Sequence, residues 1–95
     1  MLHLKRKAGH SVRIQHQLIV TVCRLDEAEI FLKVTRPGIE DRVLRAVIGQ
    51  TVTLHTLPEH AAVKITLSGI RSGEAALAFD APQNIQIDRL EKLTL

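Results

Sequence analysis

Aromatic residues are almost absent from this chain. Its 95 residues include two Phe and no Tyr or Trp. Many nucleic-acid-binding modules stack bases on platforms of aromatic side chains, and the composition argues against a surface of that kind. Any contact with RNA would have to use Arg and Lys side chains, apolar side chains and main-chain groups.

Cysteine and long apolar runs are also scarce. The single Cys23 has no partner for an internal disulfide, and no cluster of Cys and His has the spacing of a structural zinc site. No apolar run approaches the roughly 18 residues of a membrane span, and the first residues lack the apolar stretch of a secretory signal. We therefore expect a soluble cytoplasmic protein without a cofactor, in which Cys23 is a buried or half-buried strand residue.

Motifs of catalysis are missing as well. The sequence has no Gly-rich phosphate loop, no nucleophile elbow and no zinc-hydrolase helix. His55 and His60 flank Pro58, but no third or fourth ligand stands at a suitable spacing for a metal ion, so this segment is interpreted as a surface hairpin. The sequence predicts neither an enzyme nor a metal site.

Apolar and polar residues alternate along most of the chain. In the first half the alternation runs through residues 12–15, 18–23 and 30–35, which are rich in β-branched side chains. A period of two is typical of half-buried antiparallel strands. Gly9 and the pair Pro37-Gly38 are among the turn residues that separate these segments. The pattern predicts a mostly β fold with at most one or two short helices.

The second half of the chain repeats this pattern. Val52 and Leu54 match Val12 and Ile14, about forty residues earlier, and an insertion within residues 55–62 shifts the later matches by about five more. The later matches are Val63, Ile65 and Leu67 with Leu18, Val20 and Val22, and Ala75, Leu77 and Phe79 with Ile30, Leu32 and Val34. So many agreeing positions indicate an internal duplication.

The duplication predicts one pseudo-symmetric domain over residues 1–95, with one copy over 1–42 and the other over 43–95. One copy alone is too short to bury a sufficient core, whereas two packed copies can share one. Residues 39–48 are open to two interpretations. Ile39, Val43 and Val47 follow helical spacing, but the duplication aligns Leu44 with Leu4 and makes residues 43–48 a strand. We favour the strand.

The start and the end of the chain resemble the carbon storage regulator family (CsrA/RsmA). Residues 1–9, MLHLKRKAG, are similar to the opening strand and turn of that family. Residues 65–70, ITLSGI, resemble its third strand, and residues 81–89, APQNIQIDR, resemble its last loop and final strand. The resemblance covers nearly the whole chain in the family's order, and identifies it as two family units fused into a pseudo-dimer.

Members of that family are small homodimers of interwoven five-stranded subunits, and they regulate translation by binding GGA motifs in RNA hairpin loops. Each site combines the first strand of one subunit with the last strand of the other. The resemblance implies that mRNA or small regulatory RNA is contacted by Leu4, Arg6, Lys7, Ala81, Pro82, Gln83, Ile85, Ile87 and Arg89. Ile85 and Ile87 could equally be core residues.

The second composite site departs from the family pattern. Ala46 stands where the first copy has Arg6, and residues 39–42 run directly into the second copy, so that the last strand of the first copy is missing or truncated. Glu40 and Asp41 would also repel phosphate there. The sequence therefore predicts one RNA site, assembled from the two ends of the chain, and one decayed site.

Two further interpretations remain open from the sequence. The loss of basic residues in the second copy also suits a degenerate module that no longer binds RNA and acts as an antagonist or partner of a standard family member. The chain could also form a homodimer by exchanging its end strands, which would restore two equivalent sites. A membrane partner is not expected.

Overall fold

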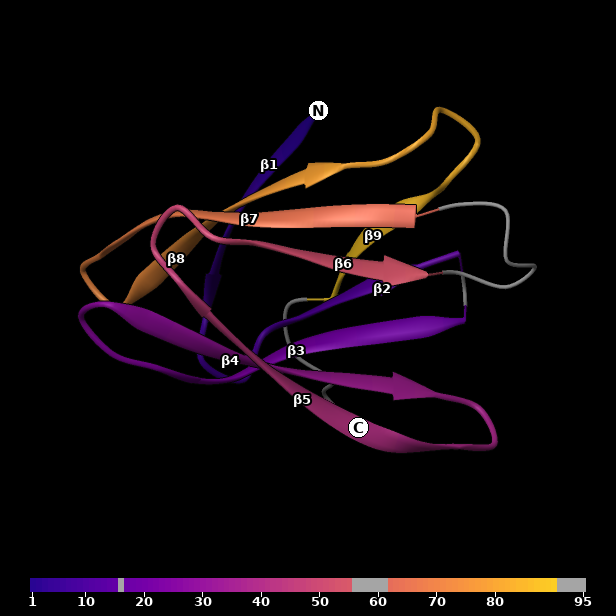
Figure 1. Cartoon of the computed structure of the whole chain (residues 1–95), viewed down its shortest axis with the longest axis horizontal. Coiled ribbons are helices and arrows are strands. Elements are labelled where there is room, and N and C mark those ends of the chain that lie inside the picture. The colour runs from indigo at the N-terminus through magenta and orange to yellow at the C-terminus, as the bar shows by residue number, and fades with distance from the viewer. Residues whose placement is uncertain (16, 56–61, 91–95) are drawn as a thin grey trace.

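Strands make up the regular structure of this protein. A computed structural model describes residues 1–15, 17–55 and 62–90, and these residues form nine strands and no helix (Figure 1). The strands are β1 (Leu2–Lys7), β2 (Ser11–Ile14), β3 (Leu18–Leu25), β4 (Glu29–Arg36), β5 (Ile39–Val47), β6 (Thr51–His55), β7 (Ala62–Arg71), β8 (Glu74–Asp80) and β9 (Ile87–Leu90). The mostly β fold predicted from the alternation is confirmed. No helix in the described part of the chain is long and apolar enough to cross a membrane.

The strands form two antiparallel sheets that pack face to face. Sheet I has the strand order β1-β8-β7-β6, and sheet II has the order β5-β4-β3-β2-β9. The inner faces of both sheets contribute to one cluster of buried apolar side chains, among them Ile14 and Leu32 from sheet II and Leu77 and Phe79 from sheet I. Because every second residue of a strand points to the same face, the period-two pattern of the sequence becomes this shared core.

Each half of the chain gives its first strand to the sheet of the other half. β1 pairs with β8, where Leu4 lies opposite Leu77. β5 pairs with β4, where Leu44 lies opposite Leu32. These two pairs are equivalent in the duplicated sequence, so the exchange is reciprocal. Neither half completes its sheet without the other.

The turn after each exchanged strand repeats the same hydrogen bonds. The Gly9 N–H donates to the Val22 oxygen at 2.7 Å, and the Gly49 N–H donates to the Leu67 oxygen at 2.7 Å. Both glycines have φ near +90°, a conformation that a side chain disfavours strongly. A β-bulge follows Val22 in β3, and another follows Leu67 in β7. The two halves thus agree in their irregularities as well as in their strands.

Gly9→Ala is expected to lower the free energy of unfolding by about 1–2 kcal/mol, because alanine must adopt the left-handed conformation there. An added Cβ at Gly9 meets no atom within 4 Å, so the cost comes from the backbone alone. Gly69→Ala is the matched control, because Gly69 has neither a positive φ nor a close neighbour. Urea denaturation should show a lower free energy of unfolding for Gly9→Ala and an unchanged one for Gly69→Ala. Equal losses of free energy in the two variants would contradict this explanation.

Residues 39–48 contain the strand β5 rather than a helix. β5 starts at Ile39 and continues to Val47, which confirms the preferred interpretation and extends it toward the amino terminus. Leu44 and Ala46 lie opposite Leu32 and Ile30 of β4. Pairing across the sheet therefore decides the conformation of this segment, against the helical spacing of its apolar residues.

Cys23 departs from the expectation of a buried or half-buried position. It lies at the β-bulge of β3, between residues that pair with consecutive positions of β4, and its side chain is exposed. Its thiol donates a hydrogen bond to the Phe31 oxygen at 3.2 Å. Because Val22 is buried, the alternation places Cys23 on the outer face of sheet II, where the bulge leaves it exposed. Of the proposed surface hairpin, His55 ends β6 as an exposed residue, whereas Pro58 and His60 lie outside the described residues. No group of three or more metal-binding side chains occurs in the described part of the chain.

β6 is an edge strand of sheet I, whereas its counterpart β2 in sheet II is covered by a further strand. β6 corresponds to β2 in the duplication, and β9 pairs along the outer side of β2. No described strand pairs along the outer side of β6. The residues of β6 also include no Lys, Arg, Asp or Glu, although the other three edge strands, β1, β5 and β9, all carry charges. Sheet II therefore has a fifth strand that sheet I lacks.

Candidate nucleic-acid interface

β1 and β9 lie on the same side of the sandwich, because β2 follows β1 in the chain and pairs with β9. A turn over residues 8–10 joins β1 to β2, which pairs in antiparallel fashion with β9. In this pairing Ile14 lies opposite Ile87, and Val12 lies opposite Arg89. β1 is therefore an edge of sheet I, and β9 is the neighbouring edge of sheet II.

A groove lies where the two ends of the chain meet. Its volume is about 390 Å³, and it is lined by Met1, Leu2, Phe79, Ala81, Pro82, Gln83, Ile85 and Ile87. Five of the nine residues predicted to contact RNA belong to this lining. Ile85 and Ile87 are half-buried and pack against the core, so both the binding and the core interpretation of these residues remain compatible with their positions.

The three residues of β1 that were predicted to contact RNA, Leu4, Arg6 and Lys7, do not line the groove. Leu4 and Arg6 point to the inner face of sheet I, with only 7% and 4% of their surface exposed. The Arg6 Nε donates a hydrogen bond to the Lys5 oxygen at 2.7 Å. Lys7 is exposed at the far end of β1 from Leu2, so the groove does not include it. From β9, Arg89 is exposed. The structure thus brings Met1 and Leu2 to the predicted loop, whereas Leu4 and Arg6 anchor β1 in the core.

Gln15 ties the predicted loop to β2, a role that the sequence did not indicate. Its N–H donates to the Gln86 oxygen at 2.9 Å, and its side-chain Oε1 accepts a hydrogen bond from the Gln86 N–H at 3.1 Å. Its Nε2 donates to the Asn84 oxygen at 3.4 Å. Gln15 has φ of 54°, which directs the chain into the turn. In the sequence, the polar pair His16-Gln17 beside this position favours a turn, but nothing there indicates the partner of Gln15.

Gln15→Ala is expected to loosen the loop, because the alanine keeps the backbone conformation but loses both side-chain hydrogen bonds. The expected cost is about 1 kcal/mol, seen as faster hydrogen exchange of the Gln86 amide. Gln15→Glu is the matched control, since a carboxylate oxygen can still accept the hydrogen bond from the Gln86 N–H. Unchanged exchange in Gln15→Ala would show that the side chain does not hold the loop.

The position that corresponds to this groove in the duplication, beside β5 and β6, lacks two features of the groove. β5 stands in the place of β1, but no described strand stands beside β6 in the place of β9. Ala46 replaces Arg6 and is fully buried opposite Ile30. In the first copy, the large Arg6 lies opposite the small Ala75. The two cross-strand pairs have exchanged their large and small members, so the core at Ala46 has no room for an arginine.

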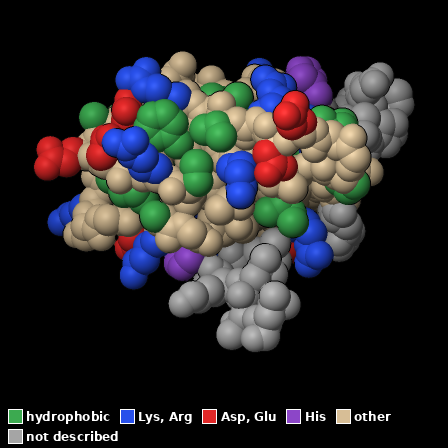
Figure 2. Space-filling model, turned by 90° about the horizontal axis from the view of Figure 1, so that it is seen from below, with side chains coloured by type: hydrophobic (Ala, Val, Ile, Leu, Met, Phe, Trp, Pro, Cys, Tyr) green, Lys and Arg blue, Asp and Glu red, His purple; other side chains and the backbone are tan. Residues whose placement is uncertain are grey.

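Charge does not single out another RNA-binding surface on the β5 side. On the face shown in Figure 2, acidic, basic and apolar side chains are interspersed without a broad area of one sign. Glu40 and Asp41 of β5, the two acidic residues that the sequence analysis singled out, are exposed. Comparison of the chain with protein-family models, curated proteins and solved structures gives no match. The functional argument therefore rests on the residues and their geometry.

Proposed function

We propose that this protein is a cytoplasmic, RNA-binding post-transcriptional regulator that recognises GGA-type motifs in hairpin loops of mRNA or small RNA. The observation that supports the proposal most is the groove that joins Met1 and Leu2 to the Ala81–Gln83 loop, Ile85 and Ile87. In the family that the sequence resembles, the RNA site also combines a first and a last strand. The groove combines the corresponding segments of this chain.

The two edge strands supply the chemistry that a GGA loop requires. Among the described strands, β1 pairs only with β8 and β9 pairs only with β2, so each has one row of main-chain groups facing outward. Such N–H and C=O groups can hydrogen-bond the edges of guanine and adenine in an unpaired loop. Arg89 can neutralise a phosphate or form two parallel hydrogen bonds with a guanine. Ile85 and Ile87 can support a splayed base without an aromatic ring.

Leu4 and Arg6 have an indirect role in this proposal. Because both side chains are buried, they set the position of the β1 main chain, which then contacts the RNA. Lys7 contributes a positive charge at the other end of β1 and attracts the RNA from a distance. The protein therefore binds one hairpin per chain, at the side where β1 and β9 are neighbours.

Titration of the purified protein with a GGA-loop hairpin tests the proposal. We expect saturation at one RNA per chain, weaker binding as salt rises, and clear preference for GGA over a scrambled loop in the same stem. Saturation at two RNAs per chain would contradict the single site. Equal affinity for both loops would contradict the function.

The uncharged outer edge of β6 favours a second candidate function, an interaction with another protein. Edge strands without charges readily accept an additional strand, so a family-like partner could pair there, as the antagonist interpretation requires. A pull-down from lysate with and without nuclease separates the two functions. Partners that are lost after nuclease treatment support RNA binding, and a defined protein retained after it supports this second candidate.

A further inference from the structure

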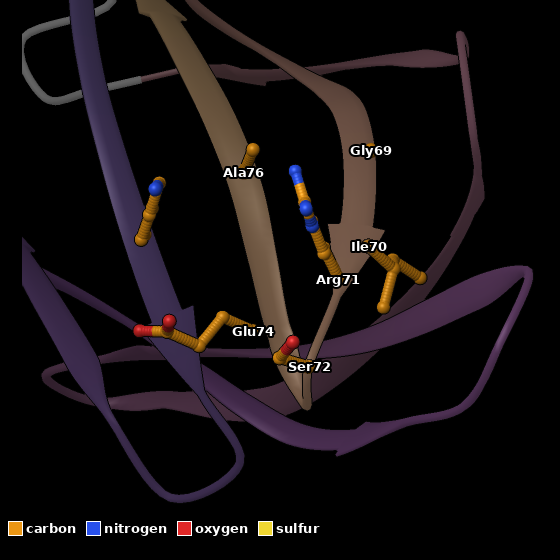
Figure 3. Close-up of a pocket in the computed structure, with 7 residues that line it drawn as sticks. Gly69, Ile70, Arg71, Ser72, Glu74 and Ala76 are labelled. Carbon is orange, nitrogen blue, oxygen red and sulfur yellow. The ribbon is translucent and has the colours of Figure 1, made fainter.

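A second hollow lies on the outer face of sheet I, away from the groove between β1 and the 81–87 segment. Its volume is about 420 Å³, and it is lined by Lys5, Gly69, Ile70, Arg71, Ser72, Glu74 and Ala76 (Figure 3). Lys5, Ala76 and Gly69 form one row across β1, β8 and β7. Lys5 and Arg71 are exposed, and neither forms an ion pair within the described part of the chain.

The corresponding row of sheet II explains why sheet I is hollow here. In sheet II the row consists of Arg24, Phe31 and Arg45. The Arg24 guanidinium lies over the Phe31 ring, 5.5 Å from its centroid. In sheet I, Gly69 and Ala76 replace this stacked pair. Two large side chains of one sheet are thus reduced to a hydrogen and a methyl group in the other, and the space that they fill is left open.

The charges around the two rows also differ. In sheet II, Arg45 donates a hydrogen bond from its Nε to Glu29 at 2.6 Å, and the turn carries Asp26 and Glu27. Asp26 accepts hydrogen bonds from the Ala28 and Glu29 N–H groups at 3.0 and 3.1 Å, which hold the pKa of its carboxyl below the ordinary value. The turn of sheet II is therefore acidic.

In sheet I, the positions of those two acidic residues are taken by Arg71 and Ser72. Arg71 extends along the face of the sheet to the level of Ala76, whereas Glu74 points toward β1 (Figure 3). Lys5 closes the row on the β1 side. The hollow of sheet I thus combines two available cations with a flat floor of small side chains.

We propose that this hollow binds a phosphate-bearing nucleotide of the RNA, one that lies outside the recognised hairpin loop. Lys5 and Arg71 neutralise its phosphate, and the planar Arg71 guanidinium stacks against its base in the space that Phe31 and Arg24 fill in sheet II. An acidic peptide would use the cations but not the flat, open floor. The inference rests on the proposed function, because it extends the path of the same RNA.

The path of β1 connects the two sites. Leu2 lines the groove and Lys5 lines the hollow, and three residues of a strand span about 10 Å. A single strand of RNA that leaves the loop or the stem can therefore reach from one to the other. Lys7 and His3, which share the outer face of β1 with Lys5, lie beside this path.

Binding of a GGA hairpin with and without a single-stranded extension tests the inference. We expect the extension to tighten binding to the wild-type protein several-fold. Lys5→Gln and Arg71→Gln should each remove part of this gain in affinity. Each should also reduce the slope of the logarithm of the association constant against the logarithm of salt concentration by about 0.7. Lys33→Gln, on the outer face of sheet II, is the matched charge control and should leave the gain unchanged.

Ala76→Phe tests the space rather than the charge. It restores the residue type that sheet II has at the equivalent position, and on the outer face of sheet I it should fill the hollow without disturbing the core. We expect Ala76→Phe to bind the bare hairpin like the wild type but to lose the gain from the extension. An extension gain that survives both the filling and the two charge variants would overturn the inference.

Titration with guanosine monophosphate separates failure of the hollow from failure of the proposed function. The Gly69 and Ala76 amide signals of the wild-type protein should shift, and the Gly69 signal of Ala76→Phe should not. Absence of these shifts and of the extension gain, in a protein that still binds the hairpin, would overturn the hollow alone. Shifts in a protein that binds no hairpin would overturn the RNA function and assign the hollow to free nucleotides.

Discussion

Arg89→Ala is expected to weaken binding of a GGA-loop hairpin by about ten- to a hundredfold, the range for losing one arginine contact to a phosphate or a base. Arg89 is the exposed cation of β9, and β9 forms the edge that meets the groove. Its side chain is solvated in the free protein, so the substitution should leave the urea midpoint almost unchanged. Fluorescence anisotropy of the labelled hairpin measures the loss.

Arg42→Ala is the control for this experiment. Arg42 and Arg89 occupy the two ends of one row across sheet II, which runs from Arg89 through Val12, Val20 and Val34 to Arg42. Both are exposed, but Arg42 lies on the edge of sheet II away from the groove. We expect Arg42→Ala to bind the hairpin like the wild type. Equal losses in the two variants would mean that both edges of sheet II bind RNA, or that affinity depends only on total charge.

Ala46→Arg is expected to lower the free energy of unfolding by at least about 3 kcal/mol, a large fraction of the stability of a small domain. Ala46 is 1% exposed and lies opposite Ile30, which is itself fully buried. An arginine there would overpack the core and would also take a guanidinium out of water. An arginine at this position, as at Arg6 of β1, is therefore expected to destabilise the fold. Urea denaturation monitored by far-UV circular dichroism measures the loss.

The double variant Ala46→Arg with Ile30→Ala tests the explanation. It copies the pair that sheet I already has, where Arg6 lies opposite Ala75. We expect the second substitution to recover part of the loss, although Ile30→Ala alone should cost about 2–5 kcal/mol as a cavity. Such coupling between neighbours is the signature of a shared space. Purely additive losses would contradict the exchange of large and small residues.

The positions of the strands could be anticipated from the sequence because their causes are local and repeated. The period-two alternation placed the strands, and the repeat showed that Leu44 corresponds to Leu4. The structure pairs them with Leu32 and Leu77 at equivalent positions. Even the choice of strand for residues 39–48 depended on this correspondence, because the spacing of its apolar residues alone favoured a helix.

Other features depend on contacts that a sequence pattern does not record. Cys23 is exposed and lies at a β-bulge, and one extra residue in a strand leaves no mark on composition. The burial of Arg6 depends on the small size of Ala75 across the sheet. The link from Gln15 to Gln86 joins residues that are far apart in the chain. In each case the partner comes from another strand, whose register a single sequence does not determine.

The three consecutive cations of β1 have a consequence during synthesis. β1 is made before its partner β8, which consists of residues 74–80 and leaves the ribosome much later. β2, β3 and β4 pair with their sequence neighbours and can fold meanwhile, whereas β1 must wait with Leu2 and Leu4 uncovered. Lys5, Arg6 and Lys7 repel the same strand of other nascent chains and so act as gatekeepers against aggregation until β8 arrives.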